Sequence, residues 1–370
     1  MIISKIKLVD FRNYSNITIS LGKKLNVFIG DNAQGKTNIL EAITMLALTK
    51  SHRIGVSPNV IRFNRKKCRI EGITKKEQIV SKLKIEMTDD SKKLFVNNTE
   101  LRKVADYISY LNVIVFTPDD LEIIKGSPNI RRNLLNIQLS QISKDYLTYY
   151  NEYNKLLKTR NEYLKVLFQN NIADRTYLDI ITDKLIDRAV YIYQRRKEYL
   201  DLVNLSINKF YHDISGDKDI HIEYNPNIDF DSYDSLVIKK RMRHIFKKNY
   251  LKELNYGMTI YGPHRDDFSF VYQDRDLKFF GSQGQQKLAI LSFKLAEIAI
   301  FKEFCNTEPV LLLDDIFSEL DIKKRNKLLK IINSDNVQSI ITTTDIRNIQ
   351  KKYIDDAYVF QVKNGIVERK

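Results

Sequence analysis

The 370-residue sequence predicts an α/β fold in which both ends of the chain build one body and a helical lobe is inserted between them. Both ends alternate short apolar strands with helices, which is typical of a parallel sheet covered by helices. The middle, from Arg131 to about Tyr211, repeats Tyr and Leu at three- and four-residue spacing, which indicates amphipathic helices. We therefore expect the first part of the body at 1–130, the inserted helical lobe at 131–250, and the second part of the body at 251–370.

The first fifty residues predict a strand, a glycine loop and a helix. Leu25–Ile29 is a short apolar strand, and Asn38–Leu48 has helical composition and spacing. The residues between them fit the pattern G-x-x-x-x-G-K-[ST], in which glycines let backbone N–H groups turn toward phosphate oxygens at a helix N-terminus. Lys36 would reach the β- and γ-phosphates of ATP, and the Thr37 hydroxyl would bind Mg²⁺. The predicted phosphate loop is Gly30, Asp31, Asn32, Ala33, Gln34, Gly35, Lys36 and Thr37.

The net charge of the chain is +15, and it is unevenly distributed. Residues 51–103 hold fourteen Lys and Arg against six Asp and Glu, whereas residues 251–370 hold eighteen against seventeen. Residues 68–100 alternate in the manner of β-strands. The excess predicts a nucleic-acid face, with phosphate contacts in Arg62–Lys76 and Lys92–Lys103. The alternative is a solvated sheet face that binds nothing.

The second half of the chain carries an acidic strand end. Val310–Leu313 is an apolar strand that runs directly into Asp314 and Asp315. A carboxylate at the carboxyl end of such a strand suits a metal, so Asp314 is the second candidate Mg²⁺ ligand and Asp315 the candidate that polarises the attacking water. Taken alone, two acids after an apolar run often mean only a solvated turn. The glycine loop elsewhere in the chain favours the catalytic interpretation.

A third motif, Gly281–Gln286, precedes an apolar helix and comes shortly before the acidic strand. It resembles the signature of ABC ATPases, in which the Ser282 and Gly284 amides, with Gln285 beside them, would contact the γ-phosphate of a nucleotide bound to a second subunit. The other interpretation is a helix-capping turn. Ser318–Asp321 then follows the acids as a D-loop does. Thr344 ends the next strand, where a histidine is common, so slow hydrolysis is expected.

Two further expectations concern the rest of the second half. Ser215–Asp234 has the composition of a loop, and Leu277–Phe280 looks like a strand. Cys68 and Cys305 are far apart in the sequence and predict neither a disulfide framework nor a metal cluster. No segment has the length of uninterrupted apolar residues that a membrane-spanning helix needs, and the first ten residues alternate like a strand rather than a signal peptide.

Several longer segments resemble the RecF family, which is a family of ABC/SMC-like ATPases. They extend from residue 9 to residue 345. The motifs that carry the resemblance are Val9–Tyr14, Ser51–Arg53, Phe116–Arg132, Tyr261–Asp267 and Ser282–Glu297.

The resemblance implies a cytoplasmic, DNA-binding ATPase that uses Mg²⁺ and pairs two copies around two nucleotides. It also implies binding to single-stranded and gapped or junction DNA, and action with RecR and RecO to help RecA load at gaps in replication restart and the SOS response. It places Arg12 at the nucleotide. His52, Arg53, His264 and Arg265 are weaker candidates, either for packing or for contacts with nucleotide or DNA.

Two departures and three rival functions qualify this resemblance. After Arg132 the chain has Asn133–Asn136 where the family usually has Arg, an aromatic residue and Asp, and Ile54–Pro58 is also atypical. The main rival function is a short-armed SMC-like structural ATPase that tethers DNA. A nucleolytic or topological enzyme would need a further acidic domain, and a transporter ATPase would have a shorter spacing between its motifs.

Overall fold

A computed structural model describes residues 1–51, 60–170, 174–334 and 337–370. The chain forms two compact units. The first unit comprises residues 1–121, 206–218 and 287–370, and the second comprises 122–205 and 219–286. A body assembled from both chain ends was expected, but the boundaries of the units differ from the expected 131 and 250. His52 and Arg53 lie outside the described residues.

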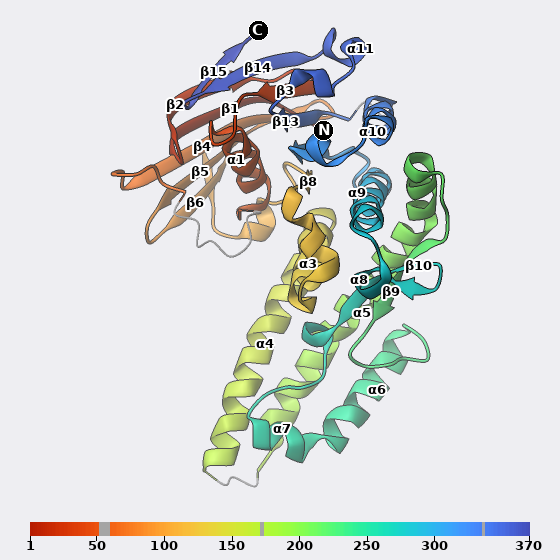
Figure 1. The fold of residues 1–370 in the computed structure, drawn as a ribbon. Coiled ribbons are helices and arrows are strands. Elements are labelled where there is room, and N and C mark those ends of the chain that lie inside the picture. The colour runs from red at the N-terminus through yellow and green to blue at the C-terminus, as the bar shows by residue number, and fades with distance from the viewer. Residues whose placement is uncertain (52–59, 171–173, 335–336) are drawn as a thin grey trace. The chain divides into compact units, whose positions relative to one another are not determined.

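The centre of the first unit is a six-stranded sheet with the order β15-β14-β3-β13-β12-β8. All neighbouring pairs are parallel except β14 and β15, which form an antiparallel hairpin. The carboxyl ends of β3, β13 and β12 therefore lie at one edge, where ligands bind in open α/β sheets (Figure 1). The strands are β3 (Leu25–Ile29), β8 (Val113–Phe116), β12 (Val310–Asp314), β13 (Ser339–Thr343), β14 (Tyr358–Lys363) and β15 (Ile366–Arg369).

A second six-stranded sheet in this unit is wholly antiparallel, with the order β2-β1-β4-β5-β6-β7. Its strands alternate buried and exposed positions because one face covers the core and the other meets solvent. This confirms the expected β character of residues 68–100. The strands are β1 (Ile2–Phe11), β2 (Tyr14–Ser20), β4 (Lys67–Lys76), β5 (Ile79–Thr88), β6 (Lys92–Val96) and β7 (Thr99–Leu101).

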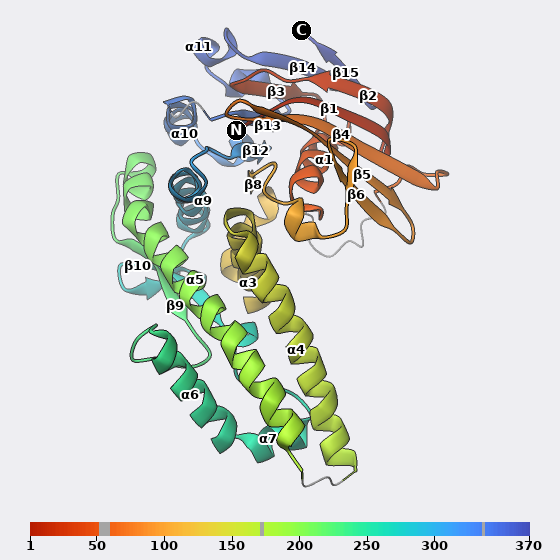
Figure 2. The same ribbon diagram turned by 180° about the vertical axis from the view of Figure 1, so that it is seen from behind.

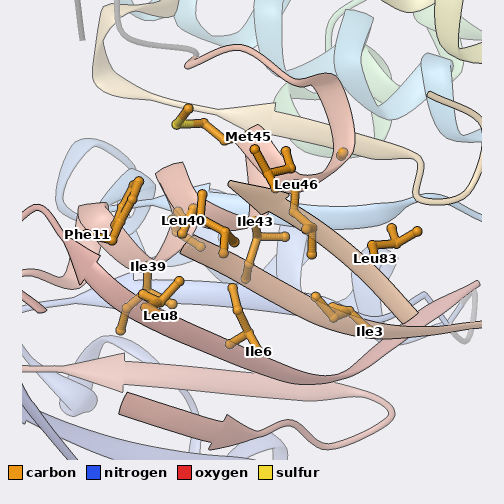
Figure 3. Close-up of a cluster of buried hydrophobic side chains, with 14 of the residues drawn as sticks. Ile3, Ile6, Leu8, Phe11, Ile39, Leu40, Ile43, Met45, Leu46 and Leu83 are labelled. Carbon is orange, nitrogen blue, oxygen red and sulfur yellow. The ribbon is translucent and has the colours of Figure 1, made fainter. Parts of the chain in front are cut away.

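Helix α1 (Lys36–Leu48) lies between the two sheets. It is apolar around most of its circumference, as a helix covered on both sides must be. Ile39, Ile43 and Leu46 are fully buried in one cluster with residues of β1 and β5 (Figure 3). The phosphate loop thus leads into the most completely buried helix of this unit, so the position of the first helical turn is fixed by core packing.

The described part of the first unit contains further α-helices. They are most of α9 (Gln283–Cys305), then α10 (Ile322–Ser334), the short α11 (Lys351–Ile354), and the last turns of α5. Within α9 the Lys294 ammonium is buried and donates to the Val115 carbonyl and to Asp120. Asp120 also accepts from the Thr117 amide at 2.9 Å. The turn after β8 is therefore tied to α9 by a buried charge pair.

The second unit is mainly helical and confirms the predicted pair of long helices. These are α4 (Lys144–Gln169) and α5 (Thr176–Ser215), with α6 (Ser235–Lys248) beside them in both views (Figure 2). Tyr153, Leu164 and Leu167 are buried, so the Tyr and Leu repeat packs the helices as expected. The shorter helices are α2 (Glu122–Lys125), α3 (Pro128–Ile142), α7 (Tyr250–Tyr256) and α8 (Leu277–Phe280).

Two expectations for this unit were wrong. Residues 220–225, expected in a loop, form β9 (Ile220–Asn225), which pairs with β10 (Asp267–Tyr272). β10 also pairs with the two-residue β11 (Arg275–Asp276). Leu277–Phe280 is α8 rather than a strand, since Asp276 caps it by accepting from the Lys278 amide at 2.7 Å. A four-residue apolar run does not distinguish the two states by periodicity.

The family-like Tyr261–Asp267 segment lies in a buried polar network of the second unit. The Arg196 guanidinium donates to Asp266 at 2.9 Å, and Tyr224 donates to the same carboxylate at 2.6 Å. Arg131 makes two hydrogen bonds to Asp267, at 2.6 and 2.9 Å. Buried charges are tolerated when they are paired and hydrogen-bonded in this way. The segment therefore has a structural role here.

His264 belongs to the same network. Its Nδ1 is 2.6 Å from the Tyr153 hydroxyl, and its Nε2 is 3.1 Å from the Thr259 carbonyl. Burial lowers the pKa of His264 to about 4. His264 is thus a neutral packing residue at physiological pH, which is one of the two roles considered for it.

In the described part of the chain, no helix is both long and apolar enough to cross a lipid bilayer.

Candidate nucleotide-binding site

The predicted phosphate loop lies at the carboxyl end of β3, in the centre of the parallel sheet. Ala33 and Gly35 have φ values of 64° and 113°, and alternation of left- and right-handed residues turns successive N–H groups to one side of a loop. A Cβ on Gly35 would lie 2.5 Å from the Asn13 side chain, and a Cβ on Gly30 would lie 2.2 Å from the Val362 carbonyl. Both glycines of the motif are therefore required by packing, and Gly35 is required by its backbone conformation as well.

Lys36 is buried with its ammonium at the loop. Its Nζ donates to the Gly30 carbonyl at 2.6 Å and to the Asp31 carbonyl at 2.8 Å. Burial is the largest influence on its pKa and lowers it, while Asp315 and Asp314 act in the opposite direction. The ammonium thus stands beside two acids and the loop, which suits a cation that neutralises phosphate oxygens.

Asp314 is the last residue of β12 and Asp315 follows it, and the structure places the Asp314 side chain against the first turn of the phosphate loop's helix. The Thr37 hydroxyl donates to Asp314 Oδ1 at 3.0 Å. Asp315 comes next, with φ 47°, at the start of the turn η4 (Ile316–Glu319). Asp314 is buried and Asp315 half-buried. The two predicted metal ligands are therefore neighbours, although 277 residues separate them in the chain.

Thr342 organises both acids, a role that its place in the sequence did not predict. Its hydroxyl donates to Asp314 Oδ1 at 2.6 Å and accepts from the Asp315 amide at 3.0 Å. It is the penultimate residue of β13, the strand between β3 and β12. The available signal was its position at the end of an apolar strand next to the phosphate-loop strand.

The donor set at Thr37 and Asp314 fits Mg²⁺. A hydroxyl and a carboxylate are hard oxygen ligands, and Mg²⁺ completes its octahedron with waters and substrate phosphates. Within the described ranges, no three His, Cys, Asp or Glu side chains gather into a metal site. A metal held by Thr37 and Asp314 would therefore depend on the triphosphate for further ligands.

The turn between β1 and β2 and the tip of the β14–β15 hairpin support the outside of the phosphate loop. Asn13 donates to the Gln34 carbonyl at 3.1 Å and accepts from Asn38 at 2.8 Å. The Asn364 amide donates to the Gln34 side chain at 2.7 Å. Tyr14 donates to the Gly35 carbonyl at 3.0 Å. The β1–β2 turn thus bonds to backbone carbonyls of the phosphate loop, and the β14–β15 hairpin bonds to the side chain of Gln34.

Arg12, expected at the nucleotide, forms a two-bond ion pair with Glu41 of α1, at 2.7 and 3.0 Å. Glu41 is fully buried and also accepts from Ser51 at 2.7 Å. The structure thus places the Arg12 guanidinium on α1.

The signature segment belongs to the second unit, at the N-terminus of α9. Ser282 and Gln285 cap the helix reciprocally: the Gln285 amide donates to Ser282 Oγ at 3.3 Å, and the Ser282 amide donates to Gln285 Oε1 at 2.9 Å. The capping turn is therefore present. It does not compete with a ligand role, because Ser282 and Gly284 are both exposed. A Cβ on Gly284 would meet only Ser282 Oγ, at 3.9 Å.

The outer face of the antiparallel sheet carries some of the basic residues expected to face DNA, such as Arg69 and Lys93, and acids accompany the basic residues there. Arg69 and Lys82 pair with Glu71 at 2.9 and 3.6 Å, and Lys84 pairs with Glu86 at 3.0 Å. Lys93 lies 3.9 Å from Glu100. The face is therefore of mixed charge, which is closer to the solvated alternative for these particular residues.

A glycine loop follows a central strand, a second strand of the same sheet ends in a candidate metal-binding acid, and β13 lies between the two strands. Together with the capped, exposed signature, these features define an ATPase of the ABC/SMC head class. A family model described as the RecF/RecN/SMC N-terminal domain matches residues 2–368. Relatives named DNA replication and repair protein RecF are 38% identical in Lactobacillus johnsonii and in Listeria monocytogenes, with 100% of each chain covered in both cases. The chain belongs to the RecF family.

Solved structures agree with this assignment. A structure described as the recombination mediator protein RecF with ATP in the RecFOR pathway has a TM-score of 0.91 and 30% identity, covering 100% of this chain and 97% of that one. An Smc head domain from Pyrococcus furiosus has a TM-score of 0.54 and 14% identity, covering 100% of this chain and 95% of that one, and shows the shared head fold alone.

Proposed function

We propose that this protein is an ATP-gated DNA clamp of recombinational gap repair and replication restart. Two copies close over two nucleotides, and the closed pair holds DNA near gaps and junctions. It acts with RecR and RecO to help RecA load and so supports the SOS response. The family relationship supports the pathway, and the geometry of the site supports the gating.

One half of each site comes from the phosphate loop and the acidic strand. Lys36 neutralises the β- and γ-phosphate oxygens, and Thr37 and Asp314 hold Mg²⁺, which supplies further charge neutralisation. Asp315 orients the attacking water. Arg12 is the fourth candidate contact, and it would have to leave Glu41 to reach a phosphate.

The other half comes from the second copy. Ser282 and Gly284 present an open surface at the N-terminus of α9, which is 23 residues long and supplies a favourable dipole for an anion. Gln285 keeps this helical turn in place through its bond to the Ser282 amide. The single observation that carries the proposal is this exposed, capped turn, which leaves room for a phosphate from outside the chain.

Hydrolysis acts as a timer for DNA occupancy. When the γ-phosphate is lost, the contacts from the second copy lose their ligand and the pair opens. Thr344 stands where a histidine would assist hydrolysis, so a slow, DNA-stimulated rate is expected. The protein works in the cytoplasm.

The test is ATP-dependent pairing, measured by light scattering with saturating ATP and Mg²⁺, with and without gapped DNA. We expect wild type to dimerise, and both Lys36→Ala and Ser282→Arg to remain monomeric. Ser143→Ala is the matched control, because Ser143 caps α4 by accepting from the Tyr146 amide at 3.2 Å and lies outside the proposed site. Its loss costs a cap, about 1 kcal/mol, and leaves dimerisation intact.

A wild-type protein that stays monomeric under these conditions contradicts the clamp. So does a Ser282→Arg variant that pairs as well as wild type. A short-armed structural ATPase that tethers DNA is the alternative function, and it predicts DNA bridging that persists when pairing is blocked.

A further inference from the structure

Helix α6 of the second unit carries an exposed basic surface that the proposed function does not use. Residues 235–252 contain seven Lys and Arg and no Asp or Glu. Ile238, Met242 and Phe246 are buried along one side of α6. At the helical period, the opposite side presents a set of exposed basic side chains, here named the α6 basic face. These are Lys240, Arg241, His244, Lys247 and Lys248.

The basic side chains of α6 fall into two groups, those that pair with acids of α5 and those that remain exposed. Lys239 pairs with Asp187 at 2.6 Å and Arg243 pairs with Asp183 at 2.8 Å, so these two fasten α6 to α5 (Figure 2). Among the residues that the structure describes, no side chain of the α6 basic face lies within ion-pair distance of a carboxylate. The α6 basic face therefore differs from the outer face of the antiparallel sheet, where basic side chains pair with acids. The helix dipole accounts for cations in the last turn, but not for Lys240 and Arg241 further back.

We infer that the α6 basic face binds the phosphate backbone of DNA. This inference rests on the proposed function, because the DNA that it assigns to α6 is the DNA that the closed pair of copies holds. A helix of fourteen residues is about 21 Å long, which spans several phosphates of one strand. Contacts of this kind position a duplex without reading its sequence.

An anionic membrane is the less suitable partner. Helices that lie on a bilayer insert an apolar face between the lipids. The apolar face of α6 is occupied by protein, since Ile238 and Met242 are fully buried and the Arg160 guanidinium covers the Phe246 ring at 4.6 Å. Leu236 in the first turn of α6 is 74% exposed, but a single leucine is too little apolar surface to hold the helix in a bilayer. Most of the surface open to an external partner is basic, and the high charge density of DNA matches it.

The test compares three proteins by fluorescence anisotropy on a labelled gapped duplex across a salt series, with ATP and Mg²⁺. One is wild type and one carries Lys240→Gln, Arg241→Gln and Lys248→Gln. The matched control carries Lys155→Gln, Lys158→Gln and Lys184→Gln, which remove the same charge from exposed positions of α4 and α5 that lie among acids. Thermal unfolding verifies that all three proteins fold.

Each lost phosphate contact should reduce the slope of log affinity against log salt by about 0.9, and should weaken binding about fivefold at 0.15 M salt. The α6 variant should therefore bind about a hundredfold more weakly than wild type, and the control less than about twofold. The inference is overturned if the α6 variant binds DNA as tightly as the control variant, or if its salt slope equals that of wild type. In either case, DNA binding by wild type would still support the proposed function. Loss of binding to phosphatidylglycerol vesicles with unchanged DNA affinity also overturns the inference. Wild type that fails to bind DNA overturns both.

Discussion

Thr342→Val is the sharpest test of how the acids are held. Valine has nearly the shape of threonine, so the buried position at the end of β13 stays filled. The change removes the hydroxyl that donates to Asp314 at 2.6 Å and accepts from the Asp315 amide at 3.0 Å. Asp314 loses one orienting bond, and the Asp315 N–H loses its acceptor.

The magnitude follows from the two bonds. A hydrogen bond to a charged group contributes about 1.5–3 kcal/mol, and an unsatisfied buried donor costs about 1–3 kcal/mol. If the Asp314 bond acts fully in the transition state, its loss lowers the hydrolysis rate about 10- to 150-fold. ATP affinity should change much less, because Lys36 and the loop amides keep their contacts. The expected pattern is a fall in kcat with a nearly unchanged nucleotide Kd.

Thr343→Val supplies the matched control. Thr343 is equally buried on the same strand, but its hydroxyl donates to the Asp345 carbonyl at 3.1 Å and accepts from the Asp345 amide at 3.2 Å. Both variants should lose comparable stability, whereas only Thr342→Val should lose hydrolysis. The assays are phosphate release and titration with a fluorescent ATP analogue. Wild-type turnover in Thr342→Val, or equal losses in both variants, would refute the assigned role of Thr342.

Three further outcomes are expected. Gly30→Ala should weaken ATP binding more than tenfold in a nucleotide titration, because its Cβ would lie 2.2 Å from the Val362 carbonyl, and unaltered affinity would contradict this packing. Asp266→Asn should lower the free energy of unfolding by about 3–5 kcal/mol in a denaturant titration, whereas Asp201→Asn, at an exposed pair, should cost at most about 1 kcal/mol. His264, with a pKa of about 4 when folded, binds its proton more readily when unfolded. Stability should therefore fall by about 3 kcal/mol as the pH drops from about 6.5 to 4, and His264→Gln should lack that part of the slope.

The sequence was informative where a motif is local. The phosphate loop, its strand and its helix were predicted because one run of residues specifies the turn, the glycines and the cation together. Asp314 was predicted from an apolar strand that ends in acids. The long helices were predicted from the Tyr and Leu spacing, which needs no knowledge of what they pack against.

Features that depend on distant partners were not predictable in this way. β9 is stabilised by β10, more than forty residues later, so its own composition looked like a loop. Asn13 and Asn364 meet the phosphate loop only after the sheet has formed. The α6 basic face was also missed, because a summed charge over a segment does not separate the cations that pair within the fold from those that remain exposed.

The order of strands in the parallel sheet has a consequence for synthesis of the protein. β3, which delivers the phosphate loop, lies between β13 and β14, and both of those strands come from the last 32 residues of the 370-residue chain. At about 5–20 residues per second, roughly 15 to 60 seconds separate the appearance of β3 from that of its neighbours. During that time the nascent chain exposes an apolar strand without a partner on either edge. The phosphate loop can therefore take its native place beside Asn364 only after β13, β14 and their hairpin have been synthesised.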